Sequence, residues 1–295
     1  IEIMDTFLQI TISGLTVGAM YAVGTLALSL LWGSMGMLNM AHGAFIAIGG
    51  YTGYWVMTVL GGHWLFVLPI AALAGMLAGY ALYHLVVRWM YERDDFSVNI
   101  IIVTVAIASL VENSILNIAG PSAMRQPFRI PSGFKVSDVV VPYQTLLTLA
   151  IAIAMMVLVS WLVNKTKVGY VIRAVSQNKD AALLMGINVQ LAFTQALVLA
   201  GGIAAVSGVM VTSMTQLFPA VGYDTTIKSF IICIIAGLGN IPGALTMAFV
   251  LGMFEITVQY VFGQRYGFPA MLGLVVLVLI WRPHGVFGKA TVNRV

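Results

Sequence analysis

Two glutamates lie inside long apolar stretches of this chain and are the side chains best placed to handle charge. Glu112 falls in segment 98–118, and Glu255 falls in segment 243–262, with Gln259 one helical turn further on. An ionisable residue at membrane depth is costly and usually faces the interior of a helix bundle or a transport pathway. We therefore expect both acids to line or gate a pathway. The alternative is that they form interhelical hydrogen bonds of about 1 kcal/mol that only fix packing.

Further polar residues lie near these acids or at two breaks in the apolar pattern, at 33–43 and 236–243. Irregular backbone at membrane depth survives only where protein buries it or a watery cavity lines it. The alternative is that both breaks are loops at the inner membrane surface and that His42 is an ordinary interface histidine. The remaining pathway or gate candidates are Asn39, His42, Asn113, Asn117, Gly237, Gly239 and Asn240.

Motifs for catalysis are missing from the sequence. There is no Walker A loop, HExxH, GxSxG or Cys/His metal spacing, and the chain has 4 His and 1 Cys. We expect no catalytic residues, no metal site and no cofactor in this chain. The net charge of +4 is spread too thinly to indicate nucleic-acid binding.

The elements that position these residues are predicted to be membrane helices. Hydrophobic residues make up 60% of the chain and charged residues 8%, whereas soluble domains carry about 25% charge. A membrane-spanning helix needs about 20 apolar residues. We predict an all-α polytopic transmembrane bundle, one domain over 1–295, with about 8–9 membrane segments. They are 7–31, 40–60, 65–87, 98–118, 142–163, 191–213, 227–236, 243–262 and 268–281.

Local patterns predict how these helices lie. The basic segment 164–190 belongs inside by the positive-inside rule, which places the N-terminus and the 119–141 loop outside. Small-xxx-small pairs allow close backbone approach between helices. Asp224 and Lys228, four residues apart, are expected to form an ion pair near the membrane surface. The glycine pairs are Gly14/Gly18, Gly49/Gly53 and Gly75/Gly79.

A polar island at 164–190 carries 4 of the 14 Lys and Arg residues and contains a predicted short helix over 178–186. Asn178 suits the N-cap, Asp180 lies in the first turn where the helix dipole favours an acid, and Gly186 suits the C-terminal stop. Two helical turns are not stable alone in water. This helix must therefore dock on the membrane surface, on the chain's own loops or on a partner protein.

Four short motifs resemble those of branched-chain amino acid ABC transporter permeases of the LivH/LivM type, and the chain is closer to LivH. They occur in the family's order and cover nearly the whole length. The motifs are Asn39-Met40-Ala41-His42-Gly43-Ala44-Phe45; Arg173-Ala174 with Asn178, Ala181-Ala182 and Gly186-Ile187-Asn188; Gly237-Leu238-Gly239-Asn240-Ile241-Pro242-Gly243-Ala244; and Arg282-Pro283-His284-Gly285-Val286-Phe287-Gly288.

The resemblance implies a multi-pass permease subunit of a bacterial inner-membrane importer for branched-chain or related small amino or organic acids. It implies alternating access, a second related permease, two cytoplasmic ATPases that hold ATP and Mg, and an extracytoplasmic solute-binding protein. The short helix would then transmit ATP-driven motion. The implied ATPase-coupling residues are Arg173, Ala174, Asn178, Lys179, Asp180, Ala181, Ala182, Gly186 and Ile187.

Departures from the family pattern leave the substrate open. Ala44 stands where many relatives have Glu, and Asn240 replaces the commoner Ser. The resemblance implies that the substrate could also be another amino acid, urea, an amide or an aromatic acid. An alternative within the same class is a sugar permease of the related ribose type. A rival from a different class is an autonomous channel or an ion-coupled secondary transporter, which would move substrate without ATP.

Overall fold

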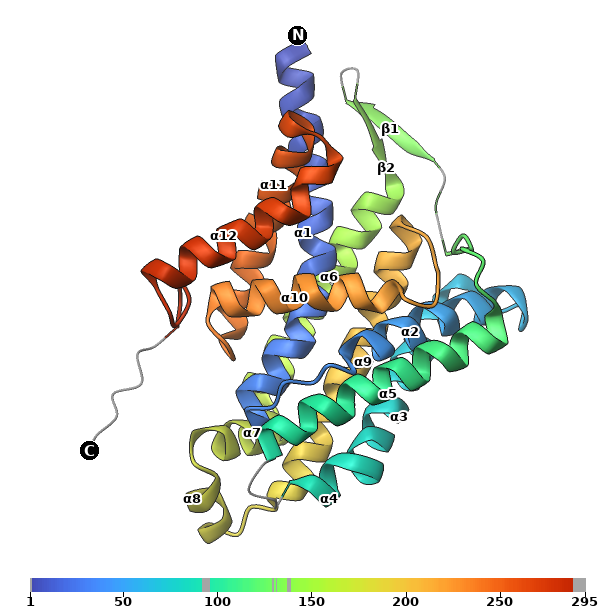
Figure 1. Ribbon diagram of the computed structural model, residues 1–295. Helices are drawn as coiled ribbons and strands as arrows, with labels where there is room; N and C mark the ends of the chain where they lie inside the picture. Colours follow the sequence, from blue (N-terminus) through green and yellow to red (C-terminus); the bar gives the residue numbers. More distant parts are fainter. Residues whose placement is uncertain (1, 92–95, 129, 131, 137–138, 289–295) are drawn as a thin grey trace.

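The structure is a computed structural model that describes residues 2–91, 96–128, 130, 132–136 and 139–288, and it is an all-α bundle with one small hairpin (Figure 1). Short helical turns flank α3 and precede α12. The helices are α1 (Glu2–Met35), α2 (His42–Thr58), a turn (Trp64–Phe66), α3 (Val67–Leu82), a π-helical turn (Tyr83–Val87), α4 (Arg88–Met90), α5 (Phe96–Ala119), α6 (Tyr143–Lys165), α7 (Lys167–Gln177), α8 (Lys179–Leu184), α9 (Val189–Met214), α10 (Val221–Ala236), α11 (Ile241–Phe262), a turn (Gln264–Tyr266) and α12 (Gly267–Trp281).

Seven helices of the described chain are long and apolar enough to cross a membrane. The α2 and α10 helices, with 17 and 16 residues, are shorter. At 1.5 Å per residue they reach roughly 25 Å, against about 30 Å of hydrocarbon. The all-α polytopic bundle is thus confirmed, and these nine helices of the described residues correspond to the nine predicted segments, of which seven are long enough to span the membrane. The α10 helix begins at Val221 rather than at 227, so the flank of the predicted segment extends it.

The α1 and α9 helices form the centre of the bundle. In their most apolar stretches, 89% of α1 and 83% of α9 are buried, against 17% for α5, α6 and α12. The peripheral helices therefore present most of their surface to lipid or to a partner. Figure 1 shows α10 running across α1 rather than alongside it.

Glycines allow the central helices to approach closely. Side chains at Gly14 or Gly18 would collide with α11, at Gly49 with Ala205 of α9, and at Gly75 or Gly79 with the α9 backbone. This confirms the predicted contacts, because in lipid close backbone packing supplies the association that water would otherwise drive.

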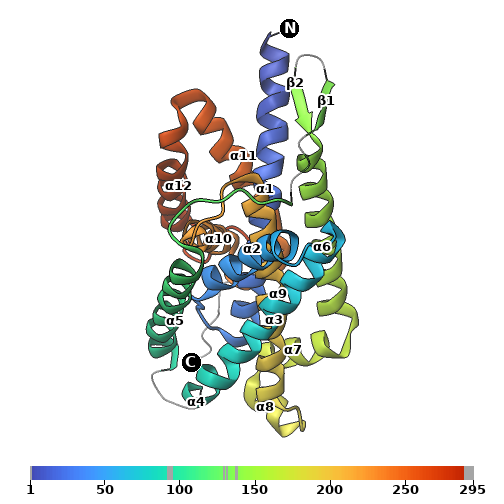
Figure 2. The ribbon, with the colours of Figure 1, turned by 90° about the vertical axis from the view of Figure 1, so that its right-hand side faces the viewer.

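The two ends of the bundle differ. The N-terminus of α1 lies at the same end as an antiparallel hairpin of β1 (Gly133–Val136) and β2 (Val139–Pro142), and α7 and α8 lie at the opposite end (Figures 1 and 2). The structure thus places these elements at opposite ends, as predicted, and the assignment of the α7 and α8 end to the inside stays a prediction. The hairpin itself was not expected from the sequence.

Candidate functional site

The α10 helix separates two cavities that contain the two intramembrane glutamates. Asp224 lies in its first turn, where the helix dipole favours an acid, and the helix stops at Gly237, whose φ of 97° suits glycine. Thr226 and Ile227 face one cavity, whereas Asp224 and Lys228 face the other. The helix thus presents a different environment on each side.

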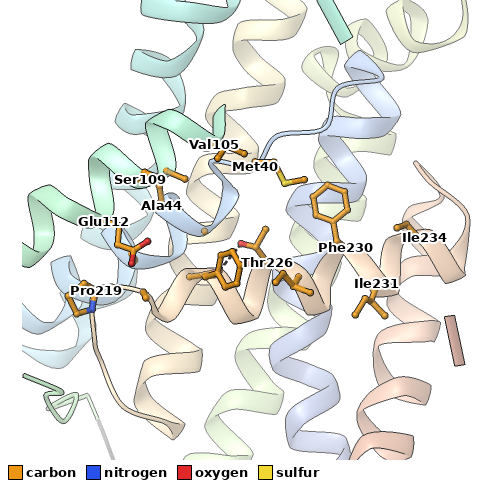
Figure 3. Close-up of a pocket in the computed structure, with 17 residues that line it drawn as sticks. Met40, Ala44, Val105, Ser109, Glu112, Pro219, Thr226, Phe230, Ile231 and Ile234 are labelled. Atoms are coloured by element: carbon orange, nitrogen blue, oxygen red, sulfur yellow. Dashed lines mark hydrogen bonds between the residues drawn. The ribbon is translucent and has the colours of Figure 1, made fainter. Parts of the chain in front are cut away.

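The first cavity has a volume of about 370 Å³ and lies between α2, α5 and α10 (Figure 3). Its floor is the crossing of α2 and α10, where a side chain at Gly43 would collide with the carbonyl of Gly222, and the reverse. The lining is mainly apolar. It comprises Met40, Gly43, Ala44, Ala47, Val105, Ala108, Ser109, Glu112, Pro219, Ala220, Gly222, Tyr223, Thr226, Ile227, Phe230, Ile231 and Ile234.

Glu112 is the one charged residue among those lining residues, and Figure 3 shows it pointing from α5 towards the start of α10. It is half-buried, and within the described chain no ion pair involves it. Asn113 instead donates a hydrogen bond to the Ser109 carbonyl at 2.8 Å, and Asn113 and Asn117 are exposed outside the cavity lining. The structure thus brings Ser109 and Glu112 to the cavity but leaves both asparagines out.

Glu255 lies on the opposite face of α10 in a closed polar network and is 2% exposed. Lys228 Nζ donates to Glu255 Oε1 at 2.7 Å and to Tyr21 Oη at 2.7 Å, and the Tyr21 hydroxyl donates to Glu255 Oε2 at 2.5 Å. Gln259 Nε2 also donates to Glu255 Oε1, at 3.1 Å. The network borders a second cavity of about 270 Å³.

The predicted Asp224–Lys228 ion pair is wrong, since Lys228 pairs with Glu255 instead. A buried carboxylate is costly unless a cation and hydrogen bonds compensate it. Glu255 on α11 is buried, whereas Asp224 is exposed to solvent. Pairing with Lys228 therefore stabilises Glu255 more than it would stabilise Asp224. Spacing within one helix could not reveal this partner.

The first break places its polar residues inside the protein. Asn39 and His42 are both 0% exposed, which excludes a surface loop at this point. Asn39 Oδ1 accepts from Ala41 N at 3.0 Å. The Asn39 Nδ2 atom and both ring nitrogens of His42 have no hydrogen-bond partner among the described residues.

The second break is a corner held by the C-terminal segment. Gly237 and Gly239 have φ values of 97° and 82°, and Asn240 caps α11 by accepting from Gly243 N at 3.0 Å. Asn240 also donates to the Phe287 carbonyl at 3.0 Å, and Phe287 N donates to the Ala236 carbonyl at 3.1 Å. The motif at 237–244 and the motif at 282–288 therefore contact each other here. Gly239 and Asn240 line a third, larger cavity of about 740 Å³ with α1, α6 and α7, not the cavity of Glu112.

The α8 helix confirms the capped two-turn helix that the sequence predicts. Asn178 Oδ1 accepts from Ala181 N at 2.9 Å, Asp180 lies in the first turn, and Gly186 has a φ of 78°. The preceding α7 was not predicted as a separate helix; Thr166 caps it by accepting from Gly169 N at 3.2 Å. Sequence signals for it were present in that Thr and the following 11 residues of amphipathic pattern.

One side of α7 and α8 packs against the bundle, and the other side is exposed. Ala182 is buried, Ile187 N donates to the Ala182 carbonyl at 3.0 Å, and Lys179 Nζ lies 4.1 Å from the centre of the Tyr91 ring. Arg173 donates to Asn164 Oδ1 at 3.1 Å, and the Ala174 carbonyl accepts from Asn178 N at 3.3 Å.

An apolar surface remains at the tip of this element. Leu183, Leu184 and Met185 are 51%, 89% and 82% exposed, and Asp180 and Ala181 lie exposed beside them. Contiguous exposed apolar side chains are typical of an interaction surface.

Comparison with known proteins places this geometry in context. The model of the branched-chain amino acid transport system / permease component family matches residues 10–281. The chain is 27% identical to the high-affinity branched-chain amino acid transport system permease protein BraD of Pseudomonas aeruginosa, and 26% identical to the permease protein LivH of Escherichia coli; each alignment covers 98% of both chains. It also shares the fold of PsaBC from Streptococcus pneumoniae, solved in complex with Fab, with a TM-score of 0.50 and 11% identity over 90% of each chain.

Proposed function

Because this multi-pass membrane chain belongs to the branched-chain amino acid transport system / permease component family, we propose that it is the permease subunit of a bacterial inner-membrane ABC importer for branched-chain or related small amino acids. The permeases BraD and LivH, which it resembles over 98% of its length, support this substrate class. Two cytoplasmic ATPases, a second related permease and an extracytoplasmic solute-binding protein complete the importer. ATP and Mg belong to the ATPases.

The α8 helix carries this proposal. It is a capped element between two membrane helices, and its exposed Leu183, Leu184 and Met185 lie at the end opposite the N-terminus and the hairpin. A helix this short needs a groove to dock in. Coupling requires that ATP binding and substrate release both shift the position of the same element. The α8 helix can meet this requirement because the chain connects it through α7 to α6 and directly to the central α9.

The cavity of Glu112 supplies the half of a translocation pathway that this chain contributes. The α5 helix that forms one wall is only 17% buried in its apolar stretch, so the second permease can cover it. Alternating access would then open this cavity to one membrane face at a time.

The test is to disrupt α8 without unfolding the bundle. Gly186→Val forces a left-handed backbone position on a β-branched residue, and Asp180→Lys reverses charge in the first turn. In proteoliposomes with the complete importer, we expect each to reduce ATP-dependent leucine uptake at least tenfold while the assembly still hydrolyses ATP.

Gly61→Val is the matched control, because Gly61 also has a positive φ of 57° and has no neighbouring atoms, but lies in the loop after α2. It should leave uptake coupled to ATP. Unchanged transport in both α8 variants would refute the coupling role. Leucine flux through this chain alone, in vesicles without ATP, would favour the channel or secondary transporter.

A further inference from the structure

The first cavity contains one charged residue and, among its lining residues, no Lys, Arg or His. We infer that Glu112 binds the ammonium group of a small aliphatic amino acid as it passes this cavity, an assignment that rests on the proposed function. The cavity volume of about 370 Å³ lies within the range of about 300–1,000 Å³ that small-molecule sites occupy.

The electrostatics of the cavity favour a cationic group. A carboxylate in mainly apolar surroundings loses part of its free energy of hydration. Only a positive group or hydrogen-bond donors can compensate for that loss. Glu255 obtains both from Lys228 and Tyr21, whereas the described chain gives Glu112 no ion-pair partner. A primary ammonium offers three donors and forms a charge-assisted hydrogen bond with a carboxylate.

The remaining lining matches the rest of such a substrate. Ile227, Phe230 and Ile231 form an apolar wall along α10, and Val105 faces them from α5. A branched aliphatic side chain can lie against that wall while its ammonium group reaches Glu112. The Ser109 hydroxyl, one helical turn before Glu112, is a neutral donor or acceptor at the same surface.

Transport provides the first test. In the complete importer reconstituted in proteoliposomes, Glu112→Gln keeps the size of the side chain but removes its charge. We expect at least a tenfold loss of leucine uptake and a smaller loss for Glu112→Asp, with ATP hydrolysis stimulated by the loaded binding protein preserved within twofold. Ser114→Ala is the control on α5, since Ser114 bonds to its own helix backbone and lies outside the cavity lining. Wild-type uptake by Glu112→Gln would overturn the inference.

A second measurement does not depend on transport. In a Cys233→Ala background, which removes the single cysteine, Ser109→Cys reports on the cavity in the assembled importer. After each rate is divided by the reagent's rate with a free thiol in solution, a cationic methanethiosulfonate should modify it at least fivefold faster than an anionic one, and Glu112→Gln should abolish that preference. Isoamylamine should slow the modification, and isocaproate, which lacks the amine, should not.

The two measurements separate the two proposals. Absence of leucine uptake by the wild-type importer, with the charge preference and isoamylamine protection present, would refute the proposed substrate and leave the ammonium site standing. Equal normalised rates with both reagents, or protection by isocaproate alone, would overturn the ammonium site whatever the importer carries.

Discussion

The glutamates on the two faces of α10 differ in how many hydrogen-bond and ion-pair partners the protein gives them. On one face, Glu255 is 2% exposed and is bonded to Lys228, Tyr21 and Gln259. On the other, Glu112 is half-buried beside an apolar cavity, with no ion pair in the described chain. Both acids satisfy the same sequence criterion, a Glu inside a membrane segment.

The difference separates a structural acid from an acid that can bind a substrate. We call the network of Tyr21, Lys228, Glu255 and Gln259 the anchor. A carboxylate that already accepts hydrogen bonds from its own protein has little capacity left for a substrate. Glu255 is such a carboxylate, and its bonds to Tyr21 and Lys228 link α1, α10 and α11. A carboxylate that faces a cavity without a partner keeps that capacity. The surroundings of an intramembrane acid, rather than its presence, therefore indicate its role.

The largest effect should come from breaking the anchor. Lys228→Ala leaves Glu255 buried without its cation, and we expect a loss of about 3 kcal/mol or more in stability, because removing one partner of a buried pair exposes the full cost of the other. Thermal unfolding of the purified chain in detergent measures this. Lys228→Met combined with Glu255→Leu should recover most of the loss, since no charge is then buried. A double variant as unstable as Lys228→Ala would contradict the anchor.

The next effect concerns the floor of the cavity. A methyl group in Gly222→Ala would collide with the Gly43 carbonyl, so α2 and α10 must separate. We expect a loss of about 1–3 kcal/mol, typical of overpacking, together with slower leucine uptake. Gly273→Ala on α12 is the control, because no atom lies near its added methyl group. Equal stability of the two variants would show that the crossing is not tight.

Sequence patterns predicted the parts of this molecule that local contacts determine. The α8 helix follows from Asn178 and Gly186, which act within a few residues of themselves. The partner of Lys228 did not follow, because Glu255 lies 27 residues away and only the packing of α10 on α11 brings them together. For the same reason, Asn113 was predicted as a pathway candidate together with Glu112, whereas the position of α10 decides which α5 residues face the cavity.

The smallest effect tests whether the hydroxyl of Tyr21 belongs to the anchor or to a pathway. Tyr21→Phe removes one donor to Glu255 and one acceptor from Lys228 while the ion pair at 2.7 Å remains. We expect a loss of about 1–2 kcal/mol in stability, as for a hydrogen bond to a charged group, and unchanged leucine uptake. Tyr260→Phe, whose hydroxyl makes one exposed contact of 3.3 Å with Thr6, should cost less than Tyr21→Phe. If Tyr21→Phe instead slowed uptake without loss of stability, the network around Glu255 would be part of the pathway, and the contrast between the two acids would no longer hold.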